Sequence, residues 1–168
     1  MAWQPTPYTV PLLIAAAASF GFTVYAVGNR SRGGRALLWS FVGVAGTAGV
    51  WALGYAAQLS APALGPTLLF NRFVWLGSAG LAVAWPAFVF AYVDRTAWLG
   101  RRRLPLLLAV PAAVAVTVLT VGVDPLFYVD PVLVDAGGYR VLAYTPTPAL
   151  LGFVGYTYAV SRVTFAGL

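Results

Sequence analysis

Histidine, lysine, cysteine and glutamate are all missing from this sequence of 168 residues. Without imidazole there is no zinc or haem ligation by histidine, no serine–histidine or cysteine–histidine nucleophile and no HExxH protease helix, because each needs an imidazole to bind metal or accept a proton. Without lysine no Schiff base can hold retinal, which excludes a conventional rhodopsin. Without cysteine there is no disulfide and no thiolate.

Acidic residues are scarce as well. The four carboxylates are Asp94, Asp124, Asp130 and Asp135, and none falls at the middle of a long apolar run. An intramembrane aspartyl protease needs two facing carboxylates in the bilayer, and proton-coupled carriers usually need at least one. Gly33-Gly34 and Gly137-Gly138 lack the rest of a phosphate-binding loop. We therefore predict no catalytic residue, no metal site, no cofactor and no enzyme activity in this chain.

Apolar residues dominate what is present. They make up 61% of the chain, and charged residues only 8%, against roughly 25% charged in a soluble domain. The uncharged runs are long enough to cross a hydrocarbon core of roughly 30 Å. The first run is too long for the apolar part of a secretory signal and no basic segment precedes it. We predict one domain over residues 1–168, an all-α integral membrane helical bundle with about five transmembrane helices near 8–28, 36–58, 71–93, 104–122 and 148–167.

The arginines predict how this bundle is oriented. Seven of them lie in the first and third connections: Arg30, Arg32, Arg35, Arg95, Arg101, Arg102 and Arg103. The second and fourth connections hold only Arg72 and Arg140. Short basic loops stay in the cytoplasm, so the N-terminus is predicted outside and the C-terminus inside a multi-pass plasma-membrane protein. The net charge of +6 is explained by these loops and does not indicate nucleic acid as a partner.

The loop at 123–147 has the pattern of a β-hairpin. Two β-prone runs, 132–134 and 139–144, flank Asp135-Ala136-Gly137-Gly138, and a Gly-Gly pair between such runs is typical of a tight turn. The orientation above predicts that this small hairpin is extracellular. The preceding segment, 124–128, is expected to lie along the membrane interface, where aromatic rings with polar tips are favoured.

Within the helices, Gly43, Gly46 and Gly49 give the second span a face of small residues, interpreted as a place where another helix of the same chain packs closely. Pro62 and Pro66 are predicted to interrupt the chain before the third span.

Five side chains are candidates for recognising a ligand or signal: Arg72, Trp51, Tyr55, Trp75 and Trp85. Arg72 is placed near the outer surface, where it either anchors the helix at the headgroups or pairs with Asp130 or Asp135 and binds an anionic ligand. The aromatic rings either pack the core or line a pocket for an apolar, quinone-like ligand. Arg162, in the last span, is expected to reach the inner interface or to face a polar bundle interior.

Several short motifs resemble a known family. They are Pro5-Thr6-Pro7-Tyr8, Trp51-Ala52-Leu53-Gly54-Tyr55, the segment 70–77 from Phe70-Asn71-Arg72 to Gly77, Trp85-Pro86 with the aromatic residues up to Tyr92, and Tyr139 with Tyr144-Thr145-Pro146 in the outer loop. In this order they resemble the N-terminal seven-transmembrane sensor region of archaeal and bacterial histidine kinases.

The resemblance implies a membrane-embedded sensory input module fused to, or associated with, cytoplasmic signalling domains that carry the phospho-accepting histidine and the ATP site. This sequence departs from the family in having about five spans instead of seven and no histidine, so it is not expected to autophosphorylate. The expected partners are the lipid bilayer, the signalling domain and a second copy in a homodimer. The alternatives are a transporter or channel subunit, disfavoured because no internal repeat is seen, and a structural membrane protein.

Overall fold

The computed structural model describes residues 3–29, 34–100, 103–120 and 126–166. Its elements are α1 (Thr9–Gly28), α2 (Arg35–Ser60), α3 (Leu64–Tyr92), the 3-10 helix η1 (Thr96–Leu99), α4 (Leu104–Thr120), β1 (Tyr128–Asp135), β2 (Arg140–Pro146) and α5 (Pro148–Ala166). The fold is therefore mostly helical with a small two-stranded antiparallel sheet, as the sequence predicts.

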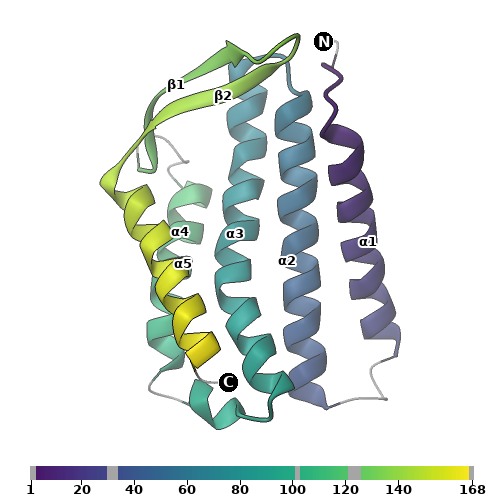
Figure 1. Ribbon diagram of the computed structural model, residues 1–168, viewed down its shortest axis with the longest axis vertical. Helices are drawn as coiled ribbons and strands as arrows, with labels where there is room; N and C mark the ends of the chain where they lie inside the picture. The colour runs from purple at the N-terminus through teal and green to yellow at the C-terminus, as the bar shows by residue number, and fades with distance from the viewer. Residues whose placement is uncertain (1–2, 30–33, 101–102, 121–125, 167–168) are drawn as a thin grey trace.

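The three longest helices stand side by side in chain order, and α4 and α5 lie on the other flank of α3 (Figure 1). The hairpin of β1 and β2 lies across one end of this bundle, the end at which α2 finishes and α3 begins (Figure 1). The N-terminal segment reaches the same end, while α5 runs to the opposite one (Figure 1). One end of the bundle is thus capped by a sheet and the other by η1.

Three helices, α1, α2 and α3, are long and apolar enough to cross a membrane. Among the described residues α4 is a shorter apolar helix of 17 residues. α5 has 19 residues but carries Arg162 and several hydroxyl groups, and it is not among those three. The described part of the chain therefore supports a membrane protein with three candidate spans, and the prediction of about five spans stays a prediction.

The start of the third helix was predicted wrongly. α3 begins at Leu64, not near residue 71, and includes Pro66. Proline is tolerated there because the amides of the first helical turn have no acceptor within the helix, so the missing N–H costs nothing. As a result Arg72 lies well inside the helix, although its side chain remains exposed.

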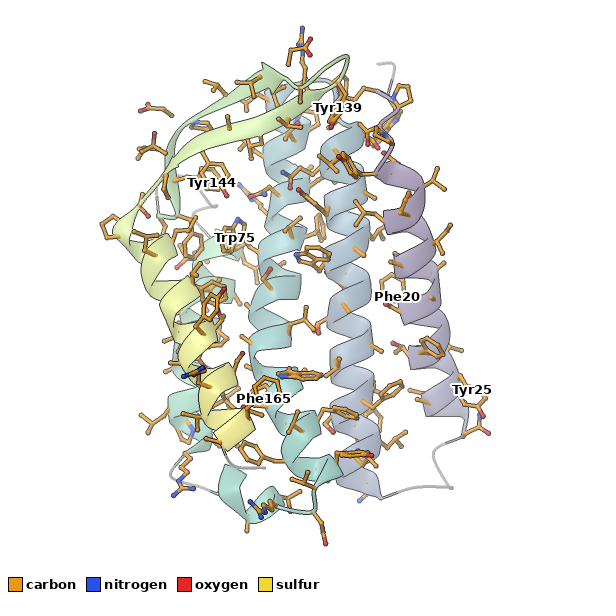
Figure 2. The ribbon with its side chains drawn as sticks, in the orientation of Figure 1. Phe20, Tyr25, Trp75, Tyr139, Tyr144 and Phe165 are labelled. Carbon is orange, nitrogen blue, oxygen red and sulfur yellow. The ribbon has the colours of Figure 1, made fainter. Side chains whose placement is uncertain are left out.

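Small residues bring α2 and α3 into close contact, as expected of the glycine face. A Cβ added at Gly43 would lie 3.2 Å from the Cβ of Ala84, and one at Gly77 would lie 2.7 Å from the backbone N of Trp51. On the other face of α2, Gly49 meets the ring of Phe20, which lies between α1 and α2 in Figure 2. The prediction of packing within the chain is confirmed at Gly43 and Gly49.

The predicted hairpin is confirmed and is longer than the sequence pattern indicated. Asp135 pairs with Arg140, and the register is interrupted between Val129 and Val132. The backbone N–H groups of Gly138 and Gly137 donate to the Asp135 carboxylate, at 3.0 and 2.8 Å. These two hydrogen bonds, that of Gly138 first, hold the pKa of Asp135 below its ordinary value of 3.8, because they favour the ionised form.

Candidate functional site

The most developed polar cluster in the described residues is centred on Asn71 of α3. Its Nδ2 donates to Oε1 of Gln58 in α2 at 2.8 Å. Its Oδ1 accepts from Nε1 of Trp75 at 2.9 Å and from the hydroxyl of Tyr128 in β1 at 2.7 Å. Tyr128 is fully buried, and Asn71 and Gln58 are nearly so. We call these four residues the Asn71 cluster; it ties two helices to the hairpin.

An aromatic stack extends the Asn71 cluster to the last helix. The rings of Trp75 and Phe127 lie parallel with centroids 4.5 Å apart. Phe153 of α5 meets both, edge-on to Trp75 at 5.9 Å and tilted to Phe127 at 6.2 Å. Figure 2 shows Trp75 on the side of α3 that faces α5, with Tyr144 below the hairpin. Aromatic contacts of this kind add to the energy of burial, so hairpin, α3 and α5 share one core.

The burial of Phe127 and Tyr128 differs from the interfacial position expected for segment 124–128. Both side chains are buried in the core that α3, α4 and α5 share. Residues 124 and 125 lie outside the described part of the chain. The hydroxyl of Tyr128 donates to Asn71, and its ring stacks on that of Tyr144 with centroids 4.5 Å apart. Tyr128 therefore does not depend on water or a headgroup for a hydrogen bond.

A second contact fastens the hairpin at its other end. The side chain of Gln4 accepts from the backbone N–H of Arg140 at 2.9 Å and donates to the carbonyl oxygen of Arg140 at 2.8 Å. The same Nε2 also donates to the carbonyl oxygen of Leu59. The backbone N–H of Gln4 donates to the carbonyl oxygen of Ser60. Gln4 thus holds the N-terminal segment between β2 and the end of α2.

The five candidate residues from the sequence do not gather in one site. Trp75 belongs to the Asn71 cluster, whereas the rings of Trp51 and Tyr55 on α2 lie tilted to each other with centroids 5.5 Å apart. Trp85 is 39% exposed and lies next to Phe88 on α3. Arg72 is exposed, and no described residue forms an ion pair with it. A single aromatic pocket made by these residues is therefore not present in the described structure.

Sequence reasoning missed most of the Asn71 cluster. Asn71 and Gln58 could have indicated a buried polar cluster, because amide side chains within apolar runs are costly in a membrane unless they form hydrogen bonds. Tyr128, Phe127 and Phe153 carried no such signal, since aromatic residues occur throughout the chain.

The arginines used for orientation lie at the end of the bundle opposite the hairpin, where the structure describes them. Arg35 begins α2, Arg95 precedes η1 and Arg103 precedes α4. Arg30, Arg32, Arg101 and Arg102 lie outside the described residues. Arg162 is exposed near the end of α5. Within the described ranges no three carboxylate, histidine or cysteine side chains gather to hold a metal ion.

Apolar helices joined through a buried amide cluster, with a hairpin docked across one end, define a helical membrane protein. Residues 11–168 match the family model described as the N-terminal 7TM region of histidine kinase. Because the match spans nearly the whole chain, the protein belongs to this family of membrane sensor regions. No curated protein and no solved structure matches it.

Proposed function

We propose that this chain is the membrane-embedded sensory input module of a signal-transducing histidine kinase and passes its signal to a cytoplasmic signalling domain. Membership of the kinase N-terminal family supports this role. The chain would bring no catalytic group of its own, in keeping with the absence of histidine. Pairing of two copies in the membrane remains a further prediction.

The observation that carries the proposal is the link between the hairpin and α5. Only Thr147 separates β2 from α5, and its backbone N–H and hydroxyl donate to the carbonyls of Phe127 and Leu126. The contacts among the rings of Phe127, Trp75 and Phe153 then fix the first turns of α5 against α3. A ligand or membrane change that favours another hairpin position would therefore shift α5 along or around its axis. Because α5 runs to the other end of the bundle, this shift would carry the signal there.

The mechanism requires the hairpin and the end of α5 to lie on opposite sides of the membrane. We propose five spans formed by α1 to α5, the N-terminus and hairpin outside, and the C-terminus in the cytoplasm. The basic residues at the η1 end support this orientation, since positive loops are retained inside.

The orientation is testable with single cysteines, because the chain has none. Ala136→Cys in the hairpin turn and Ala97→Cys in η1 both replace exposed residues. In intact cells a membrane-impermeant maleimide is expected to label Ala136→Cys at once, and Ala97→Cys only after permeabilisation. Labelling of Ala97→Cys alone in intact cells would mean that the orientation is reversed, and equal labelling of both would contradict a transmembrane bundle with these ends opposed.

Signalling is tested by joining a histidine-kinase catalytic region after Leu168 and measuring its autophosphorylation in membranes. Phe153→Leu and Tyr128→Phe each weaken the link between hairpin and α5, so each is expected to change the rate about five-fold, as a bias of about 1 kcal/mol between two states does. Leu151→Ile, at a position 61% exposed on the same helix, is the matched control and should leave the rate unchanged. Equal rates in all folded variants would count against the sensor role, and solute flux through vesicles holding the chain would favour a transporter.

A further inference from the structure

Two neighbouring cavities, each of about 340 Å³, lie between α3 and α5, and both are lined by Pro86 and Val160. The first reaches α4 and has mostly apolar walls, among them Phe90, Leu106 and Val163. The second is lined by Ser78, Ala82, Trp85, Thr157 and Ser161. They are adjoining, partly open grooves, and the second has the more polar lining.

Two residues that line the second cavity, Ala82 and Ser161, carry a hydrogen-bonding group without a partner from the helices. Pro86 has no backbone N–H, so the carbonyl of Ala82, four residues earlier, loses its usual partner in α3. The hydroxyl of Ser161 forms no hydrogen bond with any residue that the structure describes. By contrast, the hydroxyls of Ser78 and Thr157 donate to carbonyls of their own helices at 2.9 and 2.8 Å.

Leftover polar groups inside a bilayer are costly, because hydrocarbon offers them no partner. A carbonyl can only accept, whereas a hydroxyl both donates and accepts. A ligand hydroxyl has the chemistry to serve both groups, because it can donate to the Ala82 carbonyl and accept from Ser161. An apolar chain attached to it would then extend past Pro86 and Val160 into the first cavity, and the volumes are those of small-molecule sites.

We propose that these cavities bind an apolar molecule with a single alcohol or phenol hydroxyl, with the hydroxyl held between the Ala82 carbonyl and Ser161. The site is distinct from the hairpin link to α5 and does not depend on signal output. Binding is measured without a kinase domain, so a chain that fails to bind the alcohol can still be a sensor. Conversely, a chain that fails to control a kinase can still bind the alcohol.

The test is photolabelling of the full chain in lipid nanodiscs with dodecanol that carries a diazirine close to its hydroxyl. Label is expected on the peptides of α3 and α5 that line the second cavity, and excess dodecanol should displace it whereas dodecane should not. Ser161→Ala is expected to weaken labelling about five-fold, the effect of one lost hydrogen bond. Ser19→Ala is the matched control, since Ser19 lies on α1 and lines neither cavity.

Pro86→Ala provides an independent check on the carbonyl. It restores an N–H that can bond to Ala82 within the helix, so labelling should fall although the cavity gains space. Each variant is compared by circular dichroism and thermal unfolding to show that it folds. Label spread evenly over lipid-facing helices, displacement by dodecane as well as by dodecanol, or equal labelling of Ser161→Ala and Ser19→Ala would each overturn the proposal.

Discussion

Replacing Asn71 by leucine is expected to lower the free energy of unfolding by about 3–5 kcal/mol, because the substitution removes three buried hydrogen bonds at once. Leucine fills a similar volume but removes the three hydrogen bonds that Asn71 forms with the Gln58 amide, the Trp75 N–H and the Tyr128 hydroxyl. Losing a hydrogen bond of a buried polar group costs about 1–3 kcal/mol in a protein interior, with values toward the lower end in membranes.

This loss is measured by denaturant titration of the protein in detergent micelles. Tyr128→Phe removes one of the three hydrogen bonds and keeps the ring stack on Tyr144, so it should cost only about 1 kcal/mol. Asn29→Leu is the control for the amino-acid change itself, because Asn29 ends α1 and its side chain bonds the Tyr25 carbonyl in an exposed position. If Asn71→Leu unfolds at the same denaturant concentration as Asn29→Leu, the cluster does not hold the hairpin to the bundle.

Gly77→Ala should separate α2 from α3 and lower the free energy of unfolding by about 1–3 kcal/mol, as overpacking does in other cores. An added Cβ would lie 2.7 Å from both the Cβ and the backbone N of Trp51. Because these atoms belong to a helix backbone and to the base of a side chain, no rotamer change relieves the overlap. α2 and α3 must therefore move apart, and theirs is the most extensive contact between helices in the described residues.

The control for this substitution is Gly21→Ala in α1, where an added Cβ would meet nothing within 4 Å. Alanine favours helix over glycine by about 1 kcal/mol, so Gly21→Ala should be neutral or slightly stabilising. Thermal unfolding of both variants in the same detergent gives the comparison. Equal midpoints for the two would show that α2 and α3 are not packed as closely as the glycine positions indicate.

The elements of the fold could be predicted from the sequence because they depend on local composition. Long uncharged runs indicate helices that suit a bilayer, and the Gly137-Gly138 pair between β-prone runs indicates a hairpin. The start of α3 was missed because the position of Pro66, and not its presence, decides its effect: a proline in the first turn begins a helix as readily as it ends one.

The contents of the site were decided by contacts between elements far apart in the chain. Asn71 and Tyr128 are 57 residues apart, and Gln4 and Arg140 are 136 apart. No local pattern marks such pairs, because the period of a helix shows which residues share a face but not which face meets which neighbour. Trp75 and Trp51 looked equivalent for this reason, although only Trp75 reaches the hairpin.

The sequence by itself determined that this protein is helical, suited to a membrane, free of histidine-, lysine- and cysteine-based chemistry, and a member of a histidine-kinase sensor family, since composition and motifs carry these properties. The tertiary structure alone decided that the hairpin is joined to the last helix through a buried amide and three aromatic rings in contact. It also placed Pro86 and Ser161 at one cavity. Both depend on how whole helices pack, and packing is set by the summed fit of many side chains.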